Sequence, residues 1–137
     1  MDTTQLRTKF GEARVARLAT VDAGGTPHLV PVTFAVQGDV IVTAVDHKPK
    51  KTTNLQRLRN IRHNPRVSIL VDHYDDDWTQ LWWVRGDGTA VVHDDGPARE
   101  DAISALTRKY RQYQQHTPEG PAIVITISRW SGWAYEG

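Results

Sequence analysis

The 137-residue sequence contains no cysteine, so it forms neither a disulfide nor a thiolate metal site. No apolar run approaches the roughly 20 residues that a membrane-spanning helix needs. The first residues, MDTTQLRTKFGEARVARL, also lack the apolar core of a signal peptide. We therefore expect a cytoplasmic protein without a membrane partner. A chain of this length is expected to fold as one domain, residues 1–137, with a core of its own.

Several signatures of common enzyme classes are missing as well. The six histidines are scattered without HxxxH or HExxH spacing, and the acidic run at residues 75–77 lacks the alternating ligands and central glycine of a calcium loop. No metal site is therefore expected. The absence of a GxGxxG or Walker-type loop disfavours a Rossmann or P-loop phosphate site. No Ser-His-Asp or Cys-His arrangement is visible, and no residue is assigned as a catalytic acid.

Acidic residues are missing from one long stretch, although the formal net charge of the whole chain is only +1. Between His47 and Val71 there is no Asp or Glu, and the cations are Lys48, Lys50, Lys51, Arg57, Arg59, Arg62 and Arg66. The three lysines directly precede Thr52, Thr53 and Asn54, which are favourable helix N-cap residues. The N–H groups at a helix start, the helix dipole and nearby ammonium groups together suit a phosphate or polycarboxylate.

The same stretch also fits a solvated basic helix face, and composition alone does not separate the two interpretations. The small net charge and the acidic residues between positions 72 and 77 leave no extended track for a phosphate backbone. We therefore expect no nucleic-acid partner.

The pattern of apolar residues predicts a mainly β protein. Alternation and turn residues predict strands at residues 15–21, 27–36, 40–45, 67–73, 81–93 and 122–128. The first three are joined by short turns and predict an antiparallel meander. Helices are expected at 3–12, capped by Thr3 or Thr4, at 52–63 and at 97–109. Gly86 and Gly88 mark a bend or bulge in the fifth strand. This order describes a small antiparallel β-barrel with two or three helices.

Five tryptophans are many for this length, and Trp78, Trp82 and Trp83 lie within six positions. Large aromatic side chains gathered in this way often line a ligand site or an oligomer interface. Trp82 and Trp83 point to opposite faces of one strand, so one of them belongs to the core or to an interface. Tyr74, Trp78 and Trp82 are the candidate substrate-pocket residues. Trp130 and Trp133 are expected to pack a C-terminal tail onto a dimer.

The order of short motifs resembles the pyridoxamine-phosphate-oxidase-like split β-barrel family of flavin and deazaflavin oxidoreductases, and within it the branch that uses coenzyme F420. The resemblance covers most of residues 14–95 and, weakly, the last strand. The motifs are Ala19-Thr20-Val21-Asp22 with Gly25-x-Pro27-His28, Pro31-Val32-x-Phe34, Lys51-Thr52-x-Asn54-Leu55, Asn64-Pro65-Arg66-Val67-Ser68 and Gly86-x-Gly88-x-Ala90.

The resemblance implies an FMN-binding split β-barrel that forms an obligate homodimer, with cofactors at the subunit interface. In this family, lysine or arginine after the third strand holds the phosphate, the second strand faces the flavin-type ring, and the end of the third strand touches the ring or its ribityl chain. The implied cofactor-binding residues are Pro31, Val32, Thr33, Thr43, Lys48, Lys50, Lys51, Thr52, Asn54 and Arg57. Arg59 is a further candidate for the anionic tail of the cofactor.

The resemblance implies hydride transfer between the deazaflavin C5 and a small conjugated organic substrate. The abundance of cations favours the deazaflavin, whose phospholactyl group and polyglutamate tail carry more negative charge than FMN. One alternative is an FMN-dependent oxidase or reductase on the same barrel. Another is a non-catalytic barrel that binds a cofactor or nucleic acid through the basic helix.

Overall fold

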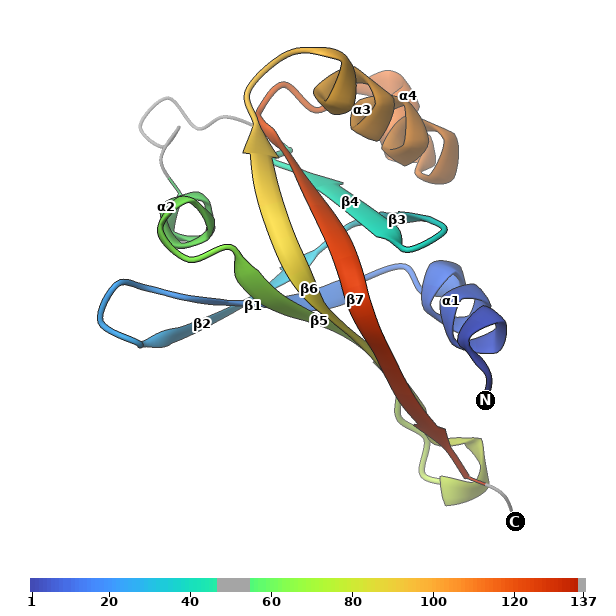
Figure 1. The fold of residues 1–137 in the computed structure, drawn as a ribbon. Helices are drawn as coiled ribbons and strands as arrows, with labels where there is room; N and C mark the ends of the chain where they lie inside the picture. Colours follow the sequence, from blue (N-terminus) through green and yellow to red (C-terminus); the bar gives the residue numbers. More distant parts are fainter. Residues whose placement is uncertain (47–54, 136–137) are drawn as a thin grey trace.

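The computed structural model describes residues 1–46 and 55–135. One seven-stranded sheet runs in the order β2-β1-β5-β6-β7-β4-β3 and curls into a half-barrel (Figure 1). Every strand pair in it is antiparallel. The strands are β1 Ala16–Val21, β2 Pro27–Val32, β3 Ala35–Gln37, β4 Val40–Ala44, β5 Arg66–His73, β6 Trp82–His93 and β7 Ala122–Ala134.

The described ranges also contain four α-helices and one 3₁₀ helix. These are α1 Thr3–Glu12, α2 Gln56–His63, α3 Pro97–Lys109, α4 Arg111–Gln115 and the 3₁₀ helix η1 Trp78–Gln80. The prediction of a mainly β, antiparallel fold is confirmed, and α4 is an addition to the two or three helices expected. Figure 1 shows α3 and α4 side by side at one end of the half-barrel and η1 at the other. None of the helices in these ranges has the length and apolar character needed to cross a bilayer.

The predicted meander of three consecutive strands is wrong. The expected strand at 27–36 is two strands, because Thr33 and Phe34 lie outside the ladder between β2 and β3. β2 pairs with β1 at one edge of the sheet, whereas β3 pairs with β4 at the other. The two edges of the curled sheet are therefore joined by only two residues, Thr33 and Phe34, which we call the strand break.

The strand break is held by residues that are distant in sequence. Phe34 is fully buried and packs edge-on against Phe10 of α1, with 5.0 Å between ring centroids. The Tyr110 hydroxyl accepts a hydrogen bond from the Phe34 N–H at 3.0 Å, and it lies 3.0 Å from the carbonyl oxygens of Phe34 and Arg14, which can accept its proton. One side chain thus replaces the ladder bonds that the break gives up.

The end of α3 reinforces the same region. Lys109 Nζ donates to the carbonyl of Ala13, the residue that ends α1, at 2.8 Å, and it lies 3.7 Å from the centroid of the Phe34 ring. Burial, with a smaller contribution from nearby Arg14, lowers the pKa of Lys109 to about 8. The cation therefore ties the end of α1 to the end of α3 across the strand break.

Three further expectations about the ends of elements need correction. Asp2, not Thr3 or Thr4, caps α1, because its carboxylate accepts from the Gln5 N–H at 2.9 Å while the Gln5 side chain accepts from the Asp2 N–H at 2.8 Å. Leu55 is extended, so α2 begins at Gln56 and not at residue 52. The expected C-terminal tail is part of β7, because the ladder with β6 continues to the Trp82–Ala134 pair.

The irregularity predicted at Gly86 and Gly88, which lie in β6, is confirmed. The register between β6 and β7 shifts between Asp87 and Gly88. A Cβ placed on Gly88 would lie 2.0 Å from the carbonyl oxygen of Thr126, so the two backbones approach too closely at this bulge for any side chain.

Replacing Tyr110 with phenylalanine is predicted to lower the free energy of unfolding by about 1–3 kcal/mol, because the buried Phe34 N–H loses its partner while the ring packing remains. Urea unfolding measures the change. Tyr135→Phe is the matched control, since that side chain is exposed at the C-terminal end, and it should leave stability unchanged. A Tyr110→Phe protein as stable as wild type would show that the hydroxyl does not hold the break.

Candidate functional site

A cavity of about 190 Å³ lies where the ends of β2 and β4 meet helices α2 and α4. We call it the β2–β4 cavity. Its lining residues are Pro31, Val32, Thr33, Thr43, Ala44, Asp46, Arg57 and Tyr113. Five of these residues, from three separate parts of the chain, are among those that the sequence analysis assigned to a cofactor: Pro31, Val32, Thr33, Thr43 and Arg57.

The other five assigned residues, Lys48, Lys50, Lys51, Thr52 and Asn54, lie outside the described residues. In the sequence these five residues lie between Asp46 and Arg57, which both line the β2–β4 cavity.

The register of β1 and β2 explains how the end of β2 contributes to the wall. Val32 lies opposite Ala16, and both are buried, whereas Pro31 lies opposite Arg17, and both are exposed. Successive residues of a strand point to opposite faces, so the end of β2 offers an apolar side chain to the interior and a proline to the outer face of the sheet. Thr43 of β4, 1% exposed, supplies a hydroxyl from the other side.

Helix α2 sets the position of Arg57. Leu58 and Ile61 of this helix are buried in the core, and Asn60 donates through Nδ2 to the buried Thr20 hydroxyl of β1 at 2.9 Å. The Asn60 side-chain oxygen accepts from Gln56 at 2.6 Å. The helix is thus fixed on the sheet by both apolar burial and a buried polar bond.

Arg57 itself is partly buried, and burial lowers its pKa below the usual value of a guanidinium. A guanidinium still keeps its charge at neutral pH, so the wall of the β2–β4 cavity carries a partly desolvated cation. Arg59, the further candidate for the tail, does not line this cavity and lies on the exposed part of α2, where it donates to the Gln56 side chain.

Tyr113 is a lining residue that the sequence analysis missed. Its hydroxyl lies 2.6 Å from Thr33 Oγ1. Burial, and to a lesser extent the charge of Asp46, raises the pKa of Tyr113, against a lowering effect of the Thr33 hydrogen bond. The phenol therefore keeps its proton at neutral pH. Tyr113 belongs to α4, whose sequence carries no helix signal, and its partner is 80 positions away.

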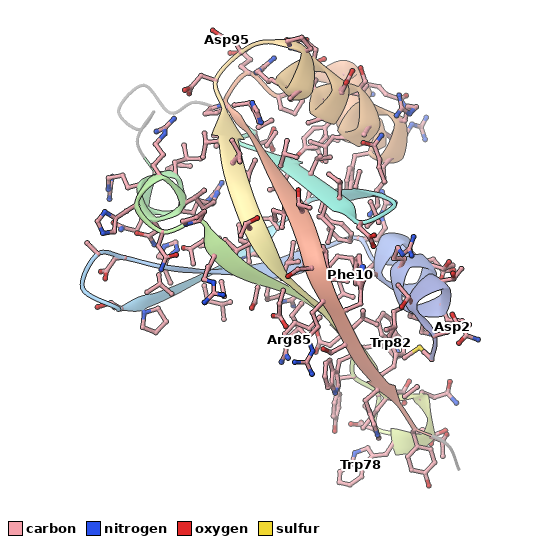
Figure 2. All side chains as sticks on the ribbon, viewed as in Figure 1. Asp2, Phe10, Trp78, Trp82, Arg85 and Asp95 are labelled. Carbon is pink, nitrogen blue, oxygen red and sulfur yellow. The ribbon has the colours of Figure 1, made fainter. Side chains whose placement is uncertain are left out.

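A second, more apolar cavity of about 470 Å³ lies toward the η1 end of the sheet, and we call it the aromatic groove. Its lining residues are Leu70, Asp72, His73, Tyr74, Leu81, Trp82, Trp83, Arg85 and Trp133. Two of the three candidate substrate-pocket residues, Tyr74 and Trp82, are therefore part of it. Trp78 is not, and its side chain is 64% exposed at the far tip of the molecule (Figure 2).

The aromatic side chains of the groove are held by neighbours. The His73 ring stacks on Trp82 with 6.3 Å between centroids, and Lys9 of α1 lies 4.8 Å from the Trp82 ring. Trp82 also packs against the core, as expected for one member of the Trp82–Trp83 pair. On the other side, the Arg85 guanidinium lies 5.8 Å from the Trp83 ring.

The β2–β4 cavity and the aromatic groove both have lining residues on the outer face of the sheet. Pro31 lies opposite Arg17, and Arg17 lies opposite Leu70, so these three form one row across β2, β1 and β5 on the outer face. Two strand spacings, roughly 10 Å, separate Pro31 of the cavity from Leu70 of the groove. Within the described part of the chain, no cluster of three metal-binding side chains is found.

Comparison with known proteins identifies the class. The sequence profile described as pyridoxamine 5'-phosphate oxidase matches residues 3–134. The chain therefore belongs to this family, and its half-barrel is the split barrel that the motif order implied. Among proteins with curated functions, no significant match was found.

Solved structures agree on the fold. A conserved hypothetical protein from Mycobacterium tuberculosis matches with a TM-score of 0.80 and 22% identity over 98% of this chain and 85% of its own. A heme-binding protein from Mycobacterium smegmatis matches with a TM-score of 0.77 and 22% identity, over 97% of this chain and 54% of its own. An FAD-binding protein from Mesorhizobium loti matches with a TM-score of 0.69 and 23% identity, over 96% of this chain and 92% of its own. At these identities the similarity concerns the fold alone.

Asn60→Ala is predicted to lower the free energy of unfolding by about 1–3 kcal/mol, because it leaves the buried Thr20 hydroxyl without its partner. Chemical unfolding monitored by tryptophan fluorescence checks the value. Arg62→Ala in the same helix is the control. It removes an exposed ion pair with Asp94 at 3.1 Å, and such pairs contribute about 0–1 kcal/mol. Equal effects of the two substitutions would contradict the anchoring role of Asn60.

Proposed function

We propose that the protein is a coenzyme F420-dependent oxidoreductase that transfers a hydride between the deazaflavin C5 and a small conjugated organic substrate. The observation that carries the proposal is the composition of the β2–β4 cavity. It combines an apolar wall at Pro31 and Val32 with the hydroxyls of Thr33 and Thr43 and a partly buried cation at Arg57. A flat ring with a polar edge and an anionic chain needs these three kinds of contact.

The charge near the cavity supports the deazaflavin over FMN. Arg57 is one of seven Lys or Arg residues between His47 and Val71, a stretch with no acidic residue. In the proposed complex, Pro31, Val32 and Thr33 face the ring and Thr43 lies at the ring or the ribityl chain. The phosphate and the anionic tail are held by Lys48, Lys50, Lys51, Thr52, Asn54 and Arg57. A long polyanion gains more from this cluster than the single phosphate of FMN does.

A second copy of the chain would complete the site. Pockets for small molecules usually enclose roughly 300–1,000 Å³, and the β2–β4 cavity of one chain has only about 190 Å³. The outer face next to it exposes Pro31 and 66% of Leu29, an apolar surface beside the cavity. We therefore propose a homodimer in which this face of each subunit contributes to the cofactor site.

The bound deazaflavin would supply the hydride chemistry, and the protein would supply position. The walls of the cavity hold the ring at the end of β2, and Arg57 neutralises the anionic chain. The aromatic groove, which reaches the same face, offers Trp83 and Tyr74 for stacking a conjugated substrate. Alignment of donor and acceptor is the main contribution such a site can make to the rate.

Two alternatives have specific support. An FMN-dependent oxidase or reductase would use the same cavity, and the FAD-binding neighbour shares this fold. A non-catalytic cofactor-binding barrel is the second, because a heme-binding neighbour also shares the fold. For that case, the aromatic groove provides a flat apolar surface beside His73, a residue type that can ligate iron.

Fluorescence titration of the purified protein with coenzyme F420 and, separately, with FMN tests the cofactor. We expect the deazaflavin to bind at least tenfold more tightly, about 1.4 kcal/mol. Lys51→Ala should weaken its affinity by at least about tenfold, since a charged hydrogen bond is worth about 1.5–3 kcal/mol. The exposed Arg108→Ala removes one positive charge from α3 and is the control for net charge.

The outcomes of this titration are distinct. Tighter binding of FMN moves the function to a flavin oxidase or reductase. Unchanged affinity in Lys51→Ala removes that lysine from the phosphate site. A protein that binds neither cofactor refutes the proposal, and titration with heme then tests the non-catalytic alternative.

Sedimentation equilibrium is expected to give about twice the chain mass of 15.5 kDa. Leu29→Arg places a charge on the proposed interface and should weaken both the dimer and cofactor binding. Ser104→Arg adds the same charge to the exposed side of α3 and should change neither. A monomeric wild-type protein that still binds cofactor would contradict the shared site.

A further inference from the structure

Two tyrosines, three positions apart at the α3–α4 junction, reach the strand break from the same side. Their rings meet edge-on with 5.5 Å between centroids. Tyr110 bonds to the backbone of Phe34, whereas Tyr113 bonds to the side chain of Thr33. The first contact faces the core and the second faces the β2–β4 cavity, because Thr33 and Tyr113 both line that cavity and neither Phe34 nor Tyr110 does.

Thr33 needs such a support because it lies outside the ladder. β2 ends at Val32 and β3 begins at Ala35, so no strand pairing fixes the residue. Among the described residues, the Tyr113 hydroxyl is the one hydrogen-bond partner of the Thr33 side chain, and the 2.6 Å distance is that of a strong bond between hydroxyls. Removing the phenol oxygen would leave the Thr33 side chain free to rotate.

We propose that Tyr113 is a positioning residue of the cofactor site, which holds Thr33 in the orientation that binds the polar edge of the ring. This inference rests on the proposed function. A protonated phenol that donates to Thr33 Oγ1 leaves the threonine hydroxyl proton for an acceptor atom in the cavity. The phenol keeps its proton at neutral pH, because burial raises the pKa of Tyr113.

The surrounding charges give the bound ligand one direction. Asp46, Tyr113 and Thr33 line the cavity together with Arg57 of α2. Asp46 is close enough to Tyr113 to raise its pKa. An anionic group is repelled by the carboxylate and attracted by the guanidinium. The neutral ring edge, with its donors and acceptors, therefore lies at Thr33 and Tyr113, and the phosphate binds Arg57.

The test compares Tyr113→Phe, Thr33→Val and the double variant in titrations with coenzyme F420 and with FMN. We expect Tyr113→Phe to lower the affinity for whichever cofactor the wild type binds by about five- to tenfold, as for one lost hydrogen bond. It should also shift the absorption maximum of the bound ring, which reports hydrogen bonding at the ring edge. Because the tyrosine acts through Thr33, the double variant should bind no more weakly than Thr33→Val alone.

Tyr110→Phe is the matched control. It removes the same atom from the neighbouring tyrosine, and it should lower the melting temperature while the affinity and the absorption maximum of the bound ring stay at their wild-type values. Tyr113→Phe should show the converse pattern, a small change in melting temperature with a clear change in affinity and spectrum. Thr33→Val removes the other partner of the same hydrogen bond. It takes the place of Tyr113→Phe in the titrations if that variant does not fold.

Three results would overturn the inference. Wild-type affinity and spectrum in Tyr113→Phe would do so and would leave the proposed function intact. Additive losses in the double variant would show that Tyr113 does not act through Thr33. A wild-type protein that binds neither cofactor would refute the proposed function, and this inference with it.

Discussion

The structure depends on how the chain is held where it leaves β2. Phe34 turns into the core, and the Tyr110 hydroxyl satisfies its backbone, so the chain can leave one edge of the sheet and start β3 at the other. An unpaired N–H at this buried position would be costly. The β2–β4 cavity exists because β2 stops at this point and β4 is brought opposite to it.

The cavity is assembled from parts that are fixed separately. Asn60 anchors α2 to β1 and so places Arg57, while α4 delivers Tyr113 against Thr33. Each attachment is a buried or partly buried polar bond, and such bonds specify geometry because their alternatives are unpaired groups. A cation, two threonine hydroxyls and an apolar strand end thereby meet in one place although they come from α2, β4, β2 and the strand break.

The sequence predicted most strands and the identity of the family, because alternation, turn glycines and motif order are local signals. It placed Pro31, Val32, Thr33, Thr43 and Arg57 together only through the resemblance, and they do line one cavity. It could not predict the strand break, since the apolar pattern continues through Phe34 and Val36. Nor could it predict Tyr113, whose hydrogen bond spans 80 positions. The cap at Asp2 was missed because Thr3 and Thr4 beside it are also favourable cap residues.

Because the half-barrel is split, its sheet ends in two edges, β2 and β3. An open edge is a template on which further strands can add, and fibrils grow in this way. Here β3 has only three residues, and β2 carries Pro27 and Pro31, which have no N–H to offer an incoming strand. Pro31, which lines the cavity, thus also protects the protein, together with Pro27, from edge-to-edge aggregation. A substitution that restores those donors would do more harm in a concentrated solution than in a dilute one.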